Sequence, residues 1–246
     1  MENMENNFYQ QELRQEQGFA GISLNRYMVK TFVMMFLGLL VTFGTAIFFS
    51  ITEPGVMLLV YGLAYIPYFL LVLLIAQLVV VIAMSAMIQK LSPAAATACF
   101  FIYSVLTGMT FTFYFLLFDL ASLILVFAAT ALYFGGMAVF GAVTKIDLSR
   151  IRTILIGGLI FLIIFNVLMM FIPGLAVADR VMCTVGVVTF LAFTAYDTQK
   201  IKTFYTAFQG DEAMLKKASV ISALELYLDF INLFLYLLRI FGKKKN

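Results

Sequence analysis

Residues 220–241 read VISALELYLDFINLFLYLLRIF, a run long enough to cross a bilayer as a helix, which takes about 20 mostly apolar residues. The polar side chains in this run are spaced by three or four positions, which places them on one face of a helix: Ser222, Glu225, Asp229, Asn232 and Tyr236. Such a face must look at protein or trapped water, not lipid. We therefore expect this helix to lie at the centre of a bundle.

The composition extends this reading to the rest of the chain. Hydrophobic residues make up 63% and charged residues 12% of the sequence, whereas soluble domains are about half apolar and about a quarter charged. Apolar runs separated by short polar connections recur along nearly all of the 246 residues. The sequence predicts an all-α, polytopic membrane protein rather than a soluble enzyme. The absence of histidine excludes Ser-His and Cys-His nucleophile pairs and histidine metal sites.

Seven segments satisfy the length and polarity of a membrane span. They run from about Val29 to Ser50, Tyr68 to Gln89, Ala94 to Phe115, Leu120 to Thr144, Ile154 to Ile172, Val181 to Gln199 and Val220 to Phe241. The apolar stretch from Pro54 to Pro67 is expected to lie at the membrane interface. Residues 1–25 are polar and glutamine-rich, so we divide the chain into a cytoplasmic N-terminal tail (1–25) and a seven-helix transmembrane domain (26–246).

Lysine and arginine in the connections predict the orientation. They gather before the first span and after the second, fourth and sixth, which puts these connections and the amino terminus in the cytoplasm. An odd number of spans puts the carboxyl terminus outside. Arg239 and the lysines at 243–245 favour the inside, so a re-entrant last segment is the alternative.

Two acids inside the predicted spans carry the functional hypothesis. An aspartate at a helix centre costs at least about 2.5 kcal/mol on insertion, so Asp197 and Asp229 each need a reason to be there. If they meet, they cannot both ionise at low cost, and the pair is expected to hold one shared proton and to sense pH. Proton loss would separate the helices or recruit a hard cation such as calcium, for which Asp197 and Asp229 are the candidate ligands. A buried carboxyl that only holds helix packing is the alternative for each acid.

Several motifs resemble the transmembrane Bax inhibitor motif family. They are Ala-Tyr-Asp-Thr-Gln-Lys-Ile at 195–201, Leu-Tyr-Leu-Asp-Phe-Ile-Asn-Leu-Phe at 226–234, Leu-Leu-Arg-Ile-Phe-Gly at 237–242, Thr-Lys-Ile-Asp-Leu-Ser at 144–149 and Arg-Tyr at 26–27. The resemblance implies seven helices with the last one wrapped by the other six. It also implies a pH-sensitive calcium leak channel, with Asp197 and Asp229 as the paired sensor and gate. A basic residue at the end of the second span would latch the closed state.

Two positions depart from the family pattern. Lys90 is the nearest match to the latch, where the family more often has arginine, whose planar fork lysine lacks. Glu225 stands where a small or neutral residue is more familiar, and it could add a third carboxylate to a cation path that also includes Ser222 and Asn232. We expect no cofactor and no nucleic-acid partner, with calcium as the transported ion and the lipid bilayer as the surroundings. The tail carries no clear retention or targeting signal, which favours a bacterial inner membrane.

Two other functions remain open from the sequence. A non-transport regulator would bind a membrane-bound protease or a cell-death effector, with the aspartate pair only structural. An intramembrane aspartyl protease would use the same pair to activate water. Against the protease, Leu226-Tyr227-Leu228 precedes Asp229 in place of the glycines that let a substrate backbone approach, and no Pro-Ala-Leu stretch follows.

Overall fold

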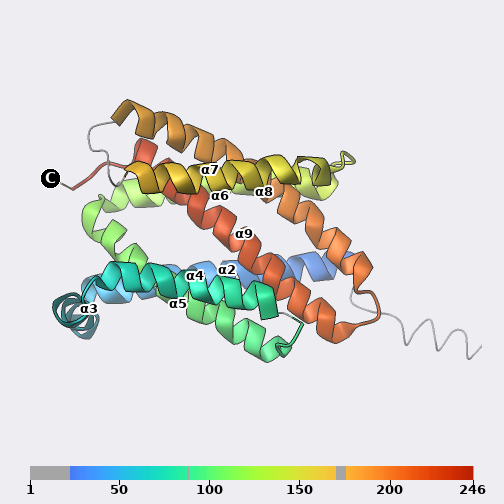
Figure 1. Ribbon diagram of the computed structural model, residues 1–246, viewed down its shortest axis with the longest axis horizontal. Coiled ribbons are helices and arrows are strands. Elements are labelled where there is room, and N and C mark those ends of the chain that lie inside the picture. Colours follow the sequence, from blue (N-terminus) through green and yellow to red (C-terminus); the bar gives the residue numbers. More distant parts are fainter. Residues whose placement is uncertain (1–22, 88, 170–175, 246) are drawn as a thin grey trace, which may run out of the picture.

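The computed structural model describes residues 23–87, 89–169 and 176–245 (Figure 1). Most of the predicted tail, residues 1–22, lies outside this range. Within it, seven helices are long and apolar enough to cross a membrane, as the sequence predicted. They are α2 (Leu24–Ile51), α4 (Phe69–Met87), α5 (Pro93–Leu117), α6 (Leu120–Val143), α7 (Arg152–Met169), α8 (Ala176–Ala207) and α9 (Glu212–Phe241), joined by the shorter α3 (Glu53–Tyr65) and a 3-10 turn, η1 (Leu148–Ile151).

The helix ends differ most from the prediction between the last two spans. Helix α8 continues past Gln199 to Ala207, and α9 begins at Glu212 instead of near Val220. Asp211 caps α9 by accepting a hydrogen bond from the Met214 N–H. Hydropathy detects only the apolar part of a helix. The polar helical turns after Gln199 and before Val220 were therefore predicted as part of the connection between the two spans. The stretch from Pro54 to Pro67 is largely α3, with a proline in its first turn.

Helix α9 is the centre of the bundle. In its most apolar 18-residue stretch, 67% of the residues are buried, against 39% or less in the other six long helices. Helices α2, α5, α6 and α8 all pack on α9. Helices α4 and α7 lie further out, on α5 and α8 respectively. In Figure 1, α9 runs diagonally between one group (α2, α4, α5) and another (α6, α7, α8). The predicted central position of the seventh span is confirmed.

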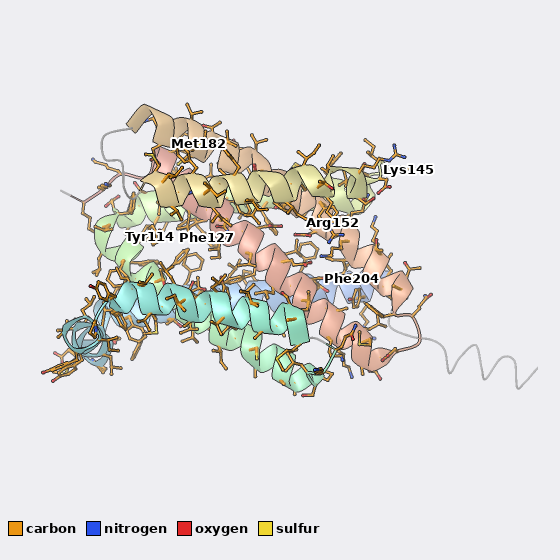
Figure 2. The ribbon with its side chains drawn as sticks, in the orientation of Figure 1. Tyr114, Phe127, Lys145, Arg152, Met182 and Phe204 are labelled. Atoms are coloured by element: carbon orange, nitrogen blue, oxygen red, sulfur yellow. The ribbon has the colours of Figure 1, made fainter. Side chains whose placement is uncertain are left out.

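Close backbone contact between α6 and α8 fixes the position of α8 along its axis relative to α6. A Cβ atom at Gly141 would lie only 2.2 Å from the Ala195 carbonyl oxygen, so only glycine allows this crossing. Nearer the start of α6, aromatic rings fill the space between α2, α6 and α9: Phe127 (Figure 2) lies 4.9 Å from Phe43 and 5.3 Å from Phe230 between ring centroids. Backbone contact and large rings together hold α9 in one register.

The carboxyl end of α9 lies against the connection between α5 and α6. The Asp119 N–H donates to the Lys243 carbonyl, and the Lys245 N–H donates to the Leu117 carbonyl, both at 2.9 Å. The start of α9 lies with the starts of α2 and α5, so α9 runs the length of the bundle and does not re-enter. The Lys245 ammonium donates to the Phe115 carbonyl at the end of α5, a favourable place for a cation at a helix C-terminus.

Candidate functional site

Asp197 of α8 and Asp229 of α9 face each other inside the bundle. The two side chains are only 7% and 4% exposed, and their carboxyl groups are close enough to interact electrostatically. Two buried carboxyl groups this close together repel each other when both are ionised, so a proton shared between them would relieve that repulsion. The structure therefore brings together the two acids that the sequence analysis paired. Their role as a pH sensor stays a prediction.

The two helices that carry this pair also hold buried oxygens without partners. Five buried side-chain polar atoms make no hydrogen bond to any residue that the structure describes, and four of them are oxygens of α8 and α9: Thr198 Oγ1, Ser222 Oγ, Glu225 Oε2 and Asp229 Oδ2. A buried polar atom without a partner is costly, so a concentration of such atoms is a sign of function or of bound water or ions. Ser222, predicted for the cation path, belongs to this group.

Glu225 makes an ion pair that the sequence analysis did not anticipate. Its Oε1 atom accepts a hydrogen bond from the Lys200 ammonium at 2.6 Å, and both side chains are about three-quarters buried. The same ammonium lies 5.1 Å from the centre of the Phe204 ring. The rule that an acid within a span needs a partner could have pointed to Lys200, which we had counted only as a charge in a connection.

Beyond Asp229, the polar side chains Asn232, Tyr236 and Arg239 of α9 each have a hydrogen-bond partner. The Asn232 amide nitrogen donates to the Leu228 carbonyl of its own helix at 2.8 Å. About two turns further on, Arg239 donates to Asn166 of α7 at 2.9 Å and forms an ion pair with Asp179 of α8. Asn232, the third residue of the predicted cation path, therefore lies one helical turn from Asp229, on the side of the paired network.

Lys90, the predicted latch, is exposed in the turn after α4. Its backbone N–H bonds to the Met87 carbonyl, but its ammonium has no hydrogen bond or ion pair within the described ranges. The buried lysine of this region is Lys217 of α9, only 7% exposed, whose ammonium donates to the Gln89 carbonyl at 3.1 Å. A lysine does tie the end of α4 to α9, but it comes from α9 itself.

Gln199 holds the connection between α6 and α7 against α8. Its amide accepts a hydrogen bond from the Leu148 N–H and donates to the Ile146 carbonyl, both at 2.8 Å. Asp147 begins η1, and hydrogen bonds from Ser149 lower the pKa of its carboxyl group below the usual range. Gln199 is two residues from Asp197, so the motif contains both an acid of the pair and the anchor of the adjacent loop.

The charged groups form no evident resident metal site. No cluster of three or more His, Cys, Asp or Glu side chains with metal-binding proximity occurs in the part of the chain that is described. Asp197 and Asp229 alone would supply few of the six to eight oxygens that calcium usually takes. The fold and this site define a polytopic helical membrane protein built around a buried acid pair.

Comparison with known proteins agrees with the resemblance seen in the motifs. The family described as inhibitor of apoptosis-promoting Bax1 matches residues 24–246, and the chain belongs to this family. The chain is 40% identical over 223 residues to the inner membrane protein YbhL of Escherichia coli strain K12, covering 90% of this chain and 93% of that protein. It is 36% identical over 222 residues to an uncharacterized protein of Borreliella burgdorferi (90% and 94% covered) and 32% identical over 223 residues to the uncharacterized protein RP147 of Rickettsia prowazekii (91% and 92% covered).

Proposed function

We propose that this protein is a pH-sensitive calcium leak channel in which Asp197 and Asp229 form the sensor and gate. The observation that supports this proposal is that two buried carboxyl groups on the neighbouring helices α8 and α9 face each other. Helix α9 is the centre of the bundle. A proton shared by the pair joins α8 to α9. This is a transport function and not catalysis.

The gate responds to pH through electrostatic repulsion. With the proton present, the two aspartates share a hydrogen bond and hold the helices together. After proton loss, two negative charges face each other where solvent screening is weak, and their repulsion favours separation of α8 from α9. Glu225 is a third carboxylate near the pair, and Lys200 partly compensates its charge. Flux is therefore expected to rise as pH rises.

Calcium fits this site as cargo. Ser222, Thr198, Glu225 and Asp229 offer side-chain oxygens without partners in the described chain, and oxygen ligands suit a hard divalent cation. Because the ion would replace the missing proton's charge, it would enter when the pair is ionised. Two facing carboxylates with scattered neutral oxygens favour brief occupancy over tight binding, which is what passage requires.

We also propose that the protein lies in a bacterial inner membrane with its amino terminus in the cytoplasm. The relative in Escherichia coli is named an inner membrane protein. The bundle end where α2 begins carries Lys30, Lys90 and Lys145, whereas Glu53 and Asp119 lie at the other end, where the lysines at 243–245 are also found. A reporter enzyme that is active only outside the cytoplasm, fused to the carboxyl terminus, should be active. An inactive periplasmic reporter together with an active cytoplasmic one would contradict this orientation.

Calcium flux into liposomes, measured from acid to neutral pH, tests the channel. The wild-type protein should give a flux that rises with pH. In Asp197→Asn and Asp229→Asn the amide can donate to the remaining carboxyl without a titrating proton, so the flux should stay low and lose its pH dependence.

Asp147→Asn is the matched control, because it makes the same chemical change at an exposed loop aspartate. Circular dichroism and gel filtration of each variant separate loss of gating from loss of fold. If both buried variants fold and still show the wild-type pH response, the sensor proposal is wrong.

A further inference from the structure

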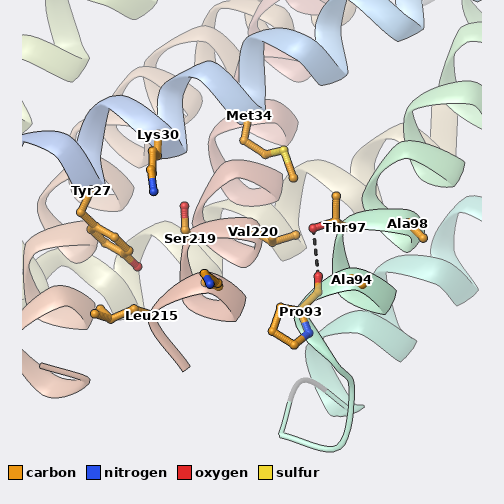
Figure 3. A pocket seen from close by; sticks show the side chains of 11 residues that line it. Tyr27, Lys30, Met34, Pro93, Ala94, Thr97, Ala98, Leu215, Ser219 and Val220 are labelled. Carbon is orange, nitrogen blue, oxygen red and sulfur yellow. Dashed lines mark hydrogen bonds between the residues drawn. The ribbon is translucent and has the colours of Figure 1, made fainter. Parts of the chain in front are cut away.

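A cavity separate from the acid pair lies where α2, α5 and α9 begin (Figure 3). Its volume is about 560 Å³, within the range of about 300–1,000 Å³ typical of small-molecule sites. Apolar side chains form most of its wall, among them Met34, Ala98 and Val220, and two lysines line it, Lys30 and Lys216. Nothing in the proposed channel function uses this cavity.

The charge around the cavity favours an anion. Three long helices start beside it, and the N-terminus of a helix carries a partial positive charge, although Ser23, Ser92 and Asp211 each cap one N–H of these helices. Lys216 is paired with Glu212 at 2.9 Å, and both side chains are more than half exposed. The ammonium of Lys30 has no ion pair to any described residue, and in Figure 3 it points toward the cavity. One cation is therefore available for a ligand.

The Tyr27 hydroxyl is an unused hydrogen-bonding group in the wall. Tyr27 is only 2% exposed, and its oxygen has no partner among the described residues. The other wall hydroxyls are occupied: Ser219 shares a hydrogen bond with Thr31 at 2.8 Å, and Thr97 donates to the Pro93 carbonyl at 2.9 Å (Figure 3). A buried hydroxyl that lines a cavity without a partner is explained if a ligand accepts its proton.

We propose that this cavity binds one anionic phospholipid. Its phosphate would lie among Lys30, the Tyr27 hydroxyl and the start of α5, and an acyl chain would follow the apolar wall formed by Met34, Ala98 and Val220. The ends of membrane-spanning helices lie at the depth of lipid headgroups, and lysines there attract anionic lipid. A free phosphate ion would match the cations but would leave the apolar wall in contact with water.

Native mass spectrometry of the full chain in detergent tests this site, with phosphatidylglycerol as the anionic probe and phosphatidylcholine as the zwitterionic one. Wild-type protein should retain one phosphatidylglycerol in preference to phosphatidylcholine. Lys30→Gln should weaken this binding by about tenfold, the usual order for a charge-assisted hydrogen bond, and Tyr27→Phe by a smaller factor, about threefold. Lys216→Gln should also weaken it, by less than Lys30→Gln, because Glu212 already partly neutralises Lys216.

Lys145→Gln is the matched control. Lys145 is also exposed and lies at the same end of the bundle but outside the cavity (Figure 2). The proposal is overturned if Lys145→Gln weakens binding as much as Lys30→Gln, if both lipids bind equally, or if inorganic phosphate displaces the lipid. Gel filtration of each variant shows whether the fold is kept. The test does not measure calcium, so its result is independent of the channel proposal.

Discussion

The two halves of α9 differ in whether their polar side chains have hydrogen-bond partners. In the half that ends at Asp229, Ser222, Glu225 and Asp229 each leave at least one buried oxygen without a partner in the described chain. In the half that ends at Phe241, Arg239 is paired with both Asp179 and Asn166. The unpartnered oxygens are the more deeply buried ones, since Ser222 and Asp229 are 1% and 4% exposed, whereas about a third of the Arg239 and Asp179 side chains is exposed.

The half around Arg239 is a structural network, whereas the half around Asp229 is a site that can change state. A fully paired network stabilises one arrangement, because breaking it leaves groups unsatisfied. Unpartnered oxygens beside a shared proton leave free energy available for a second arrangement, in which water, a cation or a moved helix satisfies them. We therefore expect substitutions in the Arg239 half to change stability and substitutions in the Asp229 half to change the response to pH.

The largest effect is expected at the crossing of α6 and α8, which supports the Asp229 half. Gly141→Val would force a side chain into the Ala195 carbonyl and should lower the free energy of unfolding by about 1–3 kcal/mol or more. The control is Gly135→Val on the same helix, where a Cβ meets no described atom within 4 Å. Unfolding in a denaturing detergent compares the two. Equal losses would show that helix propensity, not the close contact, is responsible.

Arg239→Met tests the paired half. It leaves Asp179 and Asn166 without their partner, and the free energy of unfolding should fall by about 1 kcal/mol, a modest value because about a third of each charged side chain is exposed and screened. The pH dependence of calcium flux should not change. A variant with normal stability and altered gating would reverse the comparison between the two halves.

Glu225→Gln should move the pH of half-maximal flux to a lower value. The lost carboxylate no longer repels the charge that forms on the aspartate pair, and Lys200 keeps its positive charge, so the shared proton leaves more easily. A shift of about one pH unit corresponds to about 1.4 kcal/mol of lost repulsion. Glu53→Gln, an exposed acid at the opposite end, is the control. A shift to higher pH would mean that Glu225 acts mainly by holding Lys200 in place.

The smallest effect is expected at Asp147, in the loop anchored by Gln199. Because hydrogen bonds from Ser149 lower the pKa of Asp147 in the folded state, its contribution to stability is present above the ordinary aspartate pKa and is lost as the pH falls through the lowered value. Asp147→Asn should lower the melting temperature slightly at neutral pH and not at strongly acid pH. Thermal unfolding at the two pH values tests this. An equal difference at both would exclude the titration of Asp147 as its cause.

The sequence predicted the seven spans because crossing a bilayer imposes a length and an apolar composition that can be read locally. It also predicted the central position of α9 from the spacing of Ser222, Glu225 and Asp229. The helix ends beyond Gln199 and before Val220 were missed because polar helical turns have no hydropathy signal. Binding of a protease or a death effector stays a prediction, because neither the described fold nor the similar proteins test it.

What the sequence alone determined is the membrane class, the family and the identity of the two intramembrane aspartates. Only the tertiary structure decided which charges meet. Lys200, Lys217 and Arg239 all looked like charges near helix ends, yet they pair with Glu225, the Gln89 carbonyl and Asp179. The spacing of residues fixes which face of a helix a side chain occupies, whereas its partner depends on the rotation and depth of the neighbouring helix. Those are set by contacts such as Gly141 with Ala195, which join residues far apart in the chain.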